Sequence, residues 1–266
     1  MKPSSALRLS ALLLFPALLG ALMGCASRAT APEGTATTPP GSTAPSKATE
    51  APAGGGSQEV SFRTSDGWTI VGDLYAPAGA SQGAVVLLHQ RSGSAKDWQP
   101  LCEALQKAGI IALAIDQRGA GRSTQGPGPT GDNAPWPTSE DIAAAIASLN
   151  TTGPVGLAGA SYGANNALIY AAAHPEQIKG VALFSPGANY QGLDALTPAR
   201  AYRGALLIFH ARGDGIAGDG PQQIEAASAS SDHTLNLSDG SEHGTALLRP
   251  DTIQKTVEFF TRILKP

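Results

Sequence analysis

The fold of this 266-residue chain is decided by one stretch, Val155-Gly156-Leu157-Ala158-Gly159-Ala160-Ser161-Tyr162-Gly163-Ala164. An apolar run ends abruptly in a turn of small residues, and a helix-favouring segment over 165–173 follows at once. A serine between glycines in a strand–turn–helix context is typical of a nucleophile that projects from a sharp turn. The alternative is a glycine-rich loop with an incidental serine.

Steric demands explain why small residues surround Ser161. A serine on so tight a turn adopts a strained backbone conformation, so the residues two positions away on either side must lack bulk. Gly159 and Gly163 meet that need. The hydroxyl is then exposed at a helix N-terminus, where backbone N–H groups can stabilise a developing oxyanion.

Continuous apolar runs predict five more buried strands, and amphipathic segments between them predict helices. Strands are expected over 84–89, 110–115, 155–158, 181–184, 205–209 and 233–237, and helices over 96–108, 138–149, 221–229 and 246–264, with Thr138 as a cap. Alternating segments over 60–63 and 68–75 predict a leading β-hairpin. The chain is therefore predicted to be α/β, with a mostly parallel sheet covered by helices on both faces. In such sheets the site lies beyond the carboxyl ends of the strands.

The N-terminal sequence indicates that the chain is exported, and its composition does not predict a folded domain there. Lys2 and Arg8 precede an apolar run over 9–22 that is too short to span a bilayer comfortably, and Gly24 leads to Cys25. Residues 1–24 resemble a bacterial lipoprotein signal peptide, which implies lipidation of Cys25 and a membrane anchor facing the periplasm or the cell surface. An ordinary secretory signal is the alternative. Residues 25–58 are rich in Ala, Thr, Pro, Gly and Ser, which predicts a disordered tether before a domain over 59–266.

Composition excludes several classes of function. The net charge is −3 and no basic run is present, so nucleic-acid binding has no electrostatic support. Cys102 is the only cysteine of the globular part, which rules out an intramolecular disulfide there. The sequence holds no CxxC pair, HExxH motif or Walker-type loop, and we expect neither a metal nor a cofactor.

A serine needs a base, and the base needs an orienting acid. Among the five histidines, His243 lies in a polar, glycine-flanked loop between the last strand and the last helix, and is the expected base. Asp214 follows the strand over 205–209 directly and is the favoured acid, with Asp219 as its competitor and Asp194 in the preceding connection. The backbone N–H of Tyr162, next to the nucleophile, is expected to contribute to an oxyanion hole.

Taken together, these segments resemble the α/β-hydrolases over residues 60–264. The resemblance rests on an ordered set of motifs: 88–91, 116–123, 159–163, 210–214 and 242–244. It implies Ser161 as nucleophile, His243 as base, Asp214 as acid, and the N–H of Arg91 as a second oxyanion donor beside that of Tyr162. Gln90 stands where the family usually has glycine, so its side chain could narrow the oxyanion loop.

The function expected from this resemblance is ester hydrolysis through an acyl-enzyme, as in serine carboxylesterases. No insertion is long enough for a separate cap domain, so loops over 124–137 and 186–203 are expected to wall an open site for a small-molecule ester. A lactonase similar to dienelactone hydrolases, or a thioesterase, is the alternative enzyme. A non-catalytic, surface-tethered binding protein with this fold is the alternative from another class. The sequence does not indicate an oligomeric state.

Overall fold

The computed structural model describes residues 56–131 and 138–265. The predicted signal peptide, the lipidation site at Cys25 and nearly all of the predicted tether lie outside the described residues, as does Trp136 of the 124–137 loop. The first strand begins at Gln58.

A single eight-stranded sheet organises the described part of the chain. Its order is β1-β2-β4-β3-β5-β6-β9-β10, with β1 and β2 antiparallel and every pairing from β4 to β10 parallel. The strands are β1 (Gln58–Arg63), β2 (Thr69–Tyr75), β3 (Ala84–Leu88), β4 (Ile111–Asp116), β5 (Val155–Ala160), β6 (Ile178–Phe184), β9 (Ala205–Ala211) and β10 (His233–Ser238). The predicted mostly parallel sheet with its leading antiparallel hairpin is confirmed.

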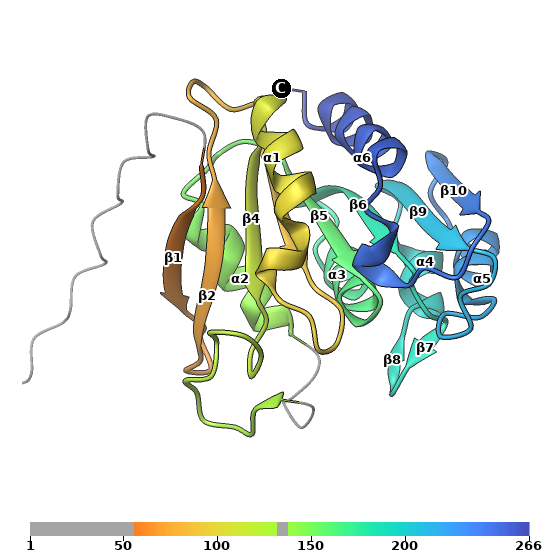
Figure 1. Cartoon of the computed structure of the whole chain (residues 1–266), viewed down its shortest axis with the longest axis horizontal. Helices are drawn as coiled ribbons and strands as arrows, with labels where there is room; N and C mark the ends of the chain where they lie inside the picture. The colour runs from red at the N-terminus through yellow and green to blue at the C-terminus, as the bar shows by residue number, and fades with distance from the viewer. Residues whose placement is uncertain (1–55, 132–137, 266) are drawn as a thin grey trace, which may run out of the picture. The chain divides into compact units, whose positions relative to one another are not determined.

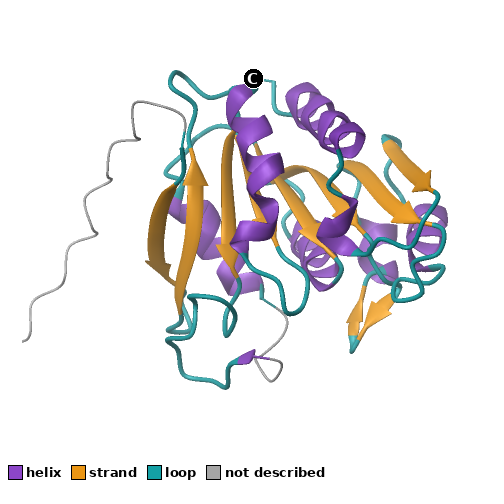
Figure 2. Cartoon of the chain, in the orientation of Figure 1, coloured by secondary structure: helices purple, strands orange, loops and turns teal. Residues whose placement is uncertain are grey.

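Helices cover both faces of the sheet (Figures 1 and 2). On one face α1 (Gln99–Lys107) and α6 (Pro250–Ile263) pack on side chains from alternate strand positions, with Leu101 and Phe260 in that core. On the other face lie α2 (Ser139–Ser148), α3 (Tyr162–Ala173), α4 (Leu196–Ala201) and α5 (Gly220–Ala227). Because β3 and β5 are buried along their whole length, their sequences are apolar throughout rather than alternating.

Two predicted helices begin later than the sequence pattern suggested. The helix expected from residue 96 is a 3₁₀ turn, η1 (Ala95–Trp98), followed by α1. The helix expected from residue 246 is likewise the 3₁₀ turn η3 (Gly244–Leu247) followed by α6. Pro100 and Pro250 explain both breaks, because proline has no N–H to continue a helix but fits well in its first turn.

Thr138 precedes α2 as predicted, but its side chain does not cap the helix. The Thr138 hydroxyl instead donates to Gln117 Oε1 at 3.2 Å. Asp141 in the first turn of α2 is fully buried and pairs with the Arg118 guanidinium at 2.8 Å. These contacts tie α2 to the loop after β4.

A small hairpin between β6 and α4 has no counterpart in the prediction. It consists of β7 (Asn189–Tyr190) and β8 (Leu193–Asp194), which pair antiparallel. Strands of two residues are too short to produce a periodic pattern. This hairpin and the six-residue α4 are the regular elements between β6 and β9, consistent with the expectation of no large cap.

Candidate active site

Ser161 occupies the sharp turn between β5 and α3. Its backbone is left-handed, with φ 51° and ψ −114°, a conformation that costs on the order of 1–3 kcal/mol for a residue other than glycine. The turn is held because the Ser161 N–H donates to the carbonyl oxygen of Phe184, at the end of β6, at 2.8 Å. The side chain therefore projects above the carboxyl ends of the central strands, where ligands bind in such sheets.

The two glycines around Ser161 are required by close backbone contacts. A Cβ at Gly159 would overlap the backbone of Gly163, because the turn doubles back on itself. A Cβ at Gly163 would overlap the carbonyl oxygens of Leu88 and His89. The start of α3 thus lies directly against the end of β3 and the beginning of the loop that follows it.

His243 and Asp214 lie side by side although 29 residues separate them. The His243 Nδ1 is 2.8 Å from Asp214 Oδ2 and 3.0 Å from Oδ1. Asp214 follows β9, and His243 lies between β10 and η3, so the two strands bring the pair together. The His243 loop also reaches the nucleophile turn, since a Cβ built on Gly244 would be 3.6 Å from the Cβ of Ala160.

The Asp214 carboxylate is buried and surrounded by donors. Its Oδ1 accepts hydrogen bonds from the backbone N–H groups of Ile216 at 3.1 Å and Ala217 at 3.2 Å. Burial disfavours the charged form, but the hydrogen bonds from His243, Ser185 and Ala217 outweigh it and hold the pKa of Asp214 below its ordinary value. The group is therefore ionised and can keep the proton of His243 on Nδ1.

Ser185, directly after β6, is a site residue that the sequence analysis missed. Its hydroxyl oxygen accepts the N–H of Gly244 at 3.0 Å, and its side chain is close enough to the Asp214 carboxylate to help lower the pKa of that group. It therefore links the acid to the loop that carries His243. Its place at the end of a central strand is the signal that could have revealed it.

The other candidate acids have structural contacts instead. Asp219 is exposed at the start of α5, where its carboxylate accepts from Gln223 Nε2 at 2.8 Å. Asp194 accepts the backbone N–H groups of Leu196 at 2.9 Å and Thr197 at 3.3 Å. Of the three aspartates, Asp214 is the one hydrogen-bonded to His243.

Two other histidines near the strand ends are buried. His89 Nδ1 lies 2.7 Å from the carbonyl oxygen of Gln90, and its Nε2 accepts the N–H of Gln117 at 3.0 Å. Burial lowers the pKa of His89 and also that of His210, so both imidazoles stay neutral. The hydrogen bonds of His89 join the loops that follow β3 and β4, so this histidine has a structural role.

The loop after β3 reaches both the His243 loop and the β7–β8 hairpin. The Gln90 side chain turns toward the His243 loop, where its Oε1 accepts the N–H of Thr245 at 3.0 Å. The Arg91 guanidinium hydrogen-bonds to Gln191 and lies 5.5 Å from the centre of the Tyr162 ring. The side chain of Arg91 thereby bridges the first turn of α3 and the hairpin tip.

Tyr190 of the hairpin lies next to the nucleophile. Its hydroxyl donates to the carbonyl oxygen of Ser185 at 3.1 Å, and burial raises its pKa, which the nearby Ser161 side chain partly lowers. Its ring stacks on that of Tyr162, with centroids 6.4 Å apart and an interplanar angle of 18°. Tyr190 belongs to the loop that the sequence predicted as a wall of the site, but its position beside the nucleophile was not foreseen.

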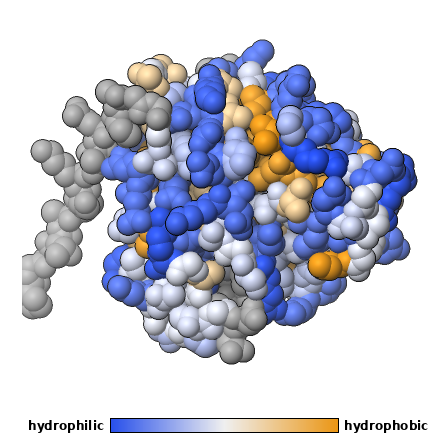
Figure 3. All heavy atoms as spheres, viewed as in Figure 1, coloured by the Kyte–Doolittle hydropathy of each residue, from blue (hydrophilic) through white to orange (hydrophobic). Residues whose placement is uncertain are grey.

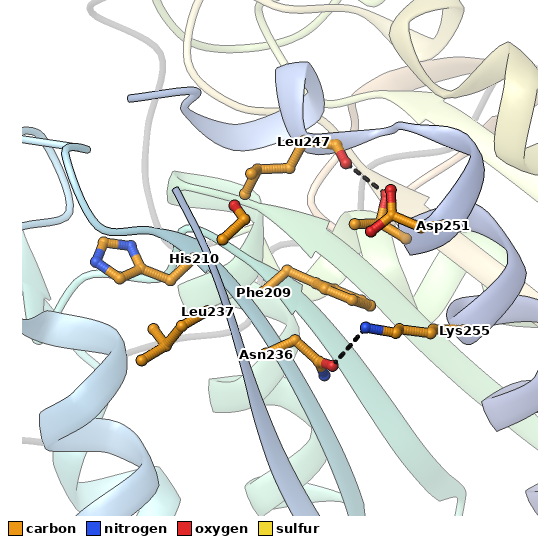
Figure 4. A pocket seen from close by; sticks show the side chains of 9 residues that line it. Phe209, His210, Asn236, Leu237, Leu247, Asp251 and Lys255 are labelled. Carbon is orange, nitrogen blue, oxygen red and sulfur yellow. Dashed lines mark hydrogen bonds between the residues drawn. The ribbon is translucent and has the colours of Figure 1, made fainter. Parts of the chain in front are cut away.

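A separate small cavity lies where β9 and β10 face η3 and α6 (Figure 4). Its volume is about 30 Å³, and the His210 imidazole points away from it in Figure 4. Asn236 Nδ2 and Ser238 Oγ are buried at its border without a hydrogen-bond partner among the described residues. This space suits about one water molecule, not a substrate.

Comparison with known proteins identifies the family. Residues 83–250 match the model of the alpha/beta hydrolase fold. The chain belongs to the α/β-hydrolase family. No curated protein sequence matches it.

Solved structures of α/β-hydrolases resemble the chain at low identity. An esterase from Pyrococcus furiosus has a TM-score of 0.66 and 19% identity, covering 79% of this chain and 92% of its own. A cold-adapted esterase from an Arctic intertidal metagenomic library has a TM-score of 0.64 and 23% identity, with coverage of 79% and 94%. A monoacylglycerol lipase from Paleococcus ferrophilus has a TM-score of 0.60 and 17% identity, with coverage of 73% and 98%. These likenesses show a shared fold.

The surface of this α/β-hydrolase is mainly polar on the face seen in Figure 3. Among the described residues, Ile216 and Leu237 are the large hydrophobic side chains classed as exposed. Within 56–131 and 138–265, no helix has the length and apolar character needed to cross a membrane. The same residues contain no cluster of three or more His, Cys, Asp or Glu side chains suited to a metal ion.

Proposed function

We propose that this α/β-hydrolase is a carboxylesterase-type serine hydrolase with Ser161 as nucleophile, His243 as general base and Asp214 as orienting acid. The observation that carries the proposal is the pairing of His243 Nδ1 with Asp214 at 2.8 Å, in a loop that approaches the turn where Ser161 is held at φ 51°. A surface loop has no physical need for a strained serine or for a buried carboxylate aimed at an imidazole.

The mechanism follows from the tautomer that Asp214 imposes. With its proton on Nδ1, His243 has a bare Nε2 that can accept the Ser161 proton as the oxygen attacks an ester carbonyl. The Tyr162 N–H and the Arg91 N–H would donate to the resulting oxyanion. His243 then returns the proton to the departing alcohol, which leaves an acyl-enzyme. Water activated by His243 releases the acid and restores Ser161.

Esters of small acyl groups are the proposed substrates. The short β7–β8 hairpin and α4 stand where a larger insertion would enclose a deep pocket. The similarity to solved esterases supports ester hydrolysis over other reactions of this fold. A panel of esters, lactones and thioesters of increasing acyl length would rank the lactonase and thioesterase alternatives against the carboxylesterase.

The decisive experiment is labelling with a fluorophosphonate probe. The full chain should be labelled, and Ser161→Ala should not be, while Ser148→Ala serves as the control that should label like the wild type, because its hydroxyl donates to the Ala145 carbonyl oxygen within α2. Equal labelling of the wild type and Ser161→Ala would refute Ser161 as the nucleophile. Absence of labelling and of turnover in the wild type would favour the non-catalytic binding protein.

We further propose that the enzyme is exported and anchored by lipid at Cys25, so that the hydrolase domain faces the periplasm or the cell surface. The support is the sequence alone: a positive start, a short apolar run and Gly24-Cys25. Metabolic labelling with a palmitate analogue should mark the wild type and not Cys25→Ser. Label that persists in the variant would exclude lipidation at this cysteine.

A further inference from the structure

The phenol of Tyr190 lies at the reaction centre of the proposed esterase. Its hydroxyl donates to the Ser185 carbonyl oxygen at 3.1 Å, one residue after Phe184, whose own carbonyl oxygen accepts the Ser161 N–H at 2.8 Å. The Tyr190 ring stacks on that of Tyr162, the residue after the nucleophile, and burial raises the pKa of Tyr190, which the nearby Ser161 side chain partly lowers. A hydroxyl beside the nucleophile lies near the atoms that become bonded to the attacked carbon, and hydrogen bonds of this kind can tighten only when substrate binds. Tyr190 therefore has a place beside the tetrahedral intermediate.

The fold holds this phenol rigidly. The fully buried Asn165 of α3 donates to the carbonyl oxygens of Gly187 at 2.9 Å and Leu193 at 2.8 Å, and accepts the Gly187 N–H at 3.1 Å. Three hydrogen bonds thus fasten both ends of the hairpin to the helix that begins at the nucleophile. A Cβ on Gly187 would lie only 2.6 Å from the Tyr190 ring, so the ring packs directly on the backbone. Such support is what a catalytic donor requires.

Sheet order tells which side of Ser161 the phenol occupies. β5, which leads to Ser161, lies between β3 and β6. The proposed oxyanion donor Arg91 follows β3, whereas Tyr190 follows β6 on the opposite side. Asp214 and His243 follow β9 and β10, which lie beyond β6 in the same direction. The tip of the hairpin reaches Arg91 through Gln191, but the Tyr190 hydroxyl itself bonds to Ser185. The Ser185 hydroxyl accepts the N–H of Gly244, next to His243, so the phenol hydroxyl lies on the side of the proposed base.

We propose that Tyr190 is a further catalytic residue, whose hydroxyl donates a hydrogen bond to the alcohol oxygen as it leaves the tetrahedral intermediate. This inference rests on the proposed ester hydrolysis at Ser161. The oxyanion is turned toward the β3 side, so the leaving oxygen lies between His243 and Tyr190.

Each proton in the departure of the alcohol can be accounted for. As the bond between the carbonyl carbon and the leaving oxygen breaks, its electron pair moves to that oxygen, which takes the proton from His243 Nε2. Tyr190 rotates its O–H from the Ser185 carbonyl to the same oxygen and keeps its own proton throughout. Burial raises the pKa of Tyr190 to about 12, so the phenol is a hydrogen-bond donor, not a proton source, at neutral pH.

The test compares two acetate esters that differ only in the leaving group. Ethyl acetate releases a strongly basic alkoxide oxygen that needs stabilisation, whereas p-nitrophenyl acetate releases a weakly basic one. Both esters give the same acetyl-enzyme. The ratio of their kcat/KM values therefore reports how strongly the enzyme assists the departure of the alcohol. Tyr190→Phe should lower kcat/KM about 10–100-fold for ethyl acetate, and about threefold or less for p-nitrophenyl acetate.

The matched control is Tyr170→Phe, because Tyr170 of α3 is also buried and its hydroxyl bonds to Gln177, at the other end of the helix. It should leave the ratio unchanged. The ratio does not depend on the folded fraction, so partial unfolding of Tyr190→Phe cannot imitate the effect. An equal loss for both esters, or none, with an active wild type would overturn the role of Tyr190 alone. A wild type inactive on both esters would instead overturn the ester hydrolysis on which it rests.

Discussion

The side chain of Gln90 accepts a hydrogen bond from the backbone N–H of Thr245 at 3.0 Å, across 155 positions of sequence. This contact ties the loop after β3 to the loop that carries His243. Gln90 also lies against Gly244, since a Cβ built there would be 2.7 Å from Gln90 Oε1. The departure from the usual glycine of the family therefore has a structural role: it fastens the proposed base to the proposed oxyanion loop.

Replacing Gln90 by the glycine that is usual in the family should reduce activity. Gln90→Gly removes the acceptor of the Thr245 N–H, a hydrogen bond worth about 0.5–1.5 kcal/mol. We expect kcat toward p-nitrophenyl acetate to fall about 2–10-fold, the rate equivalent of that energy. Amide hydrogen exchange should become faster over residues 243–247 and stay unchanged in α1. An unchanged or higher kcat would mean that the contact does not support the base.

The two aspartates that follow β9 should differ sharply in their effect on catalysis. Asp214→Asn removes the charge that holds the proton on His243 Nδ1, so we expect kcat to fall about 10³–10⁴-fold. Asp219→Asn is the matched control, because Asp219 is exposed and bonds to Gln223 instead, and its kcat should stay within about twofold of wild type. Similar losses in both variants would refute the assignment of Asp214. His243→Ala should lose about as much activity as Ser161→Ala, since the members of a triad act as a unit.

The lowered pKa of Asp214 predicts how stability depends on pH. A carboxyl whose pKa is lower in the folded state stabilises the fold above its unfolded pKa, and the contribution is lost as the pH falls through the folded pKa. The free energy of unfolding of the wild type minus that of Asp214→Asn should therefore be largest near neutral pH. This difference in the free energy of unfolding should shrink as the pH falls below about 4, the ordinary pKa of aspartate. Urea unfolding of both proteins across this range measures it, and a difference that grows toward acid would contradict the prediction.

Asn165 should be one of the most sensitive positions outside the proposed triad. Asn165→Ala leaves the carbonyl oxygens of Gly187 and Leu193 and the Gly187 N–H buried without their partner. Each of these three groups costs about 1–3 kcal/mol, so we expect the free energy of unfolding to fall by at least about 3 kcal/mol. The loosened hairpin should also make Tyr190 fluorescence more accessible to quencher in a variant whose other tyrosines are replaced.

The control for Asn165 lies in the same hairpin. Asn189 is exposed and accepts a single N–H, from Gly192 at 2.8 Å. Asn189→Ala should change the free energy of unfolding by less than about 1 kcal/mol. Equal effects of the two substitutions would show that the hairpin is not anchored through Asn165.

Much of the fold could be predicted because its buried strands appear in the sequence as continuous apolar segments. β3 and β5 are buried on both faces, so they are continuous apolar runs, and glycines at 159 and 163 mark the turn that the backbone contacts require. The β7–β8 hairpin could not be predicted in this way. Its two-residue strands depend on Asn165, more than twenty positions away, and such a contact leaves no local pattern.

The sequence by itself determined the family architecture, the turn at Ser161 and the chain order of serine, aspartate and histidine, because these follow from local periodicity and from the small residues that a sharp turn needs. Three features became visible with the folded chain: which aspartate bonds to His243, where the Gln90 side chain points, and that Ser185 and Tyr190 lie near the nucleophile turn. The physical reason is that hydrogen bonds between distant residues depend on how the ends of neighbouring strands come together, and sequence order alone does not fix that placement.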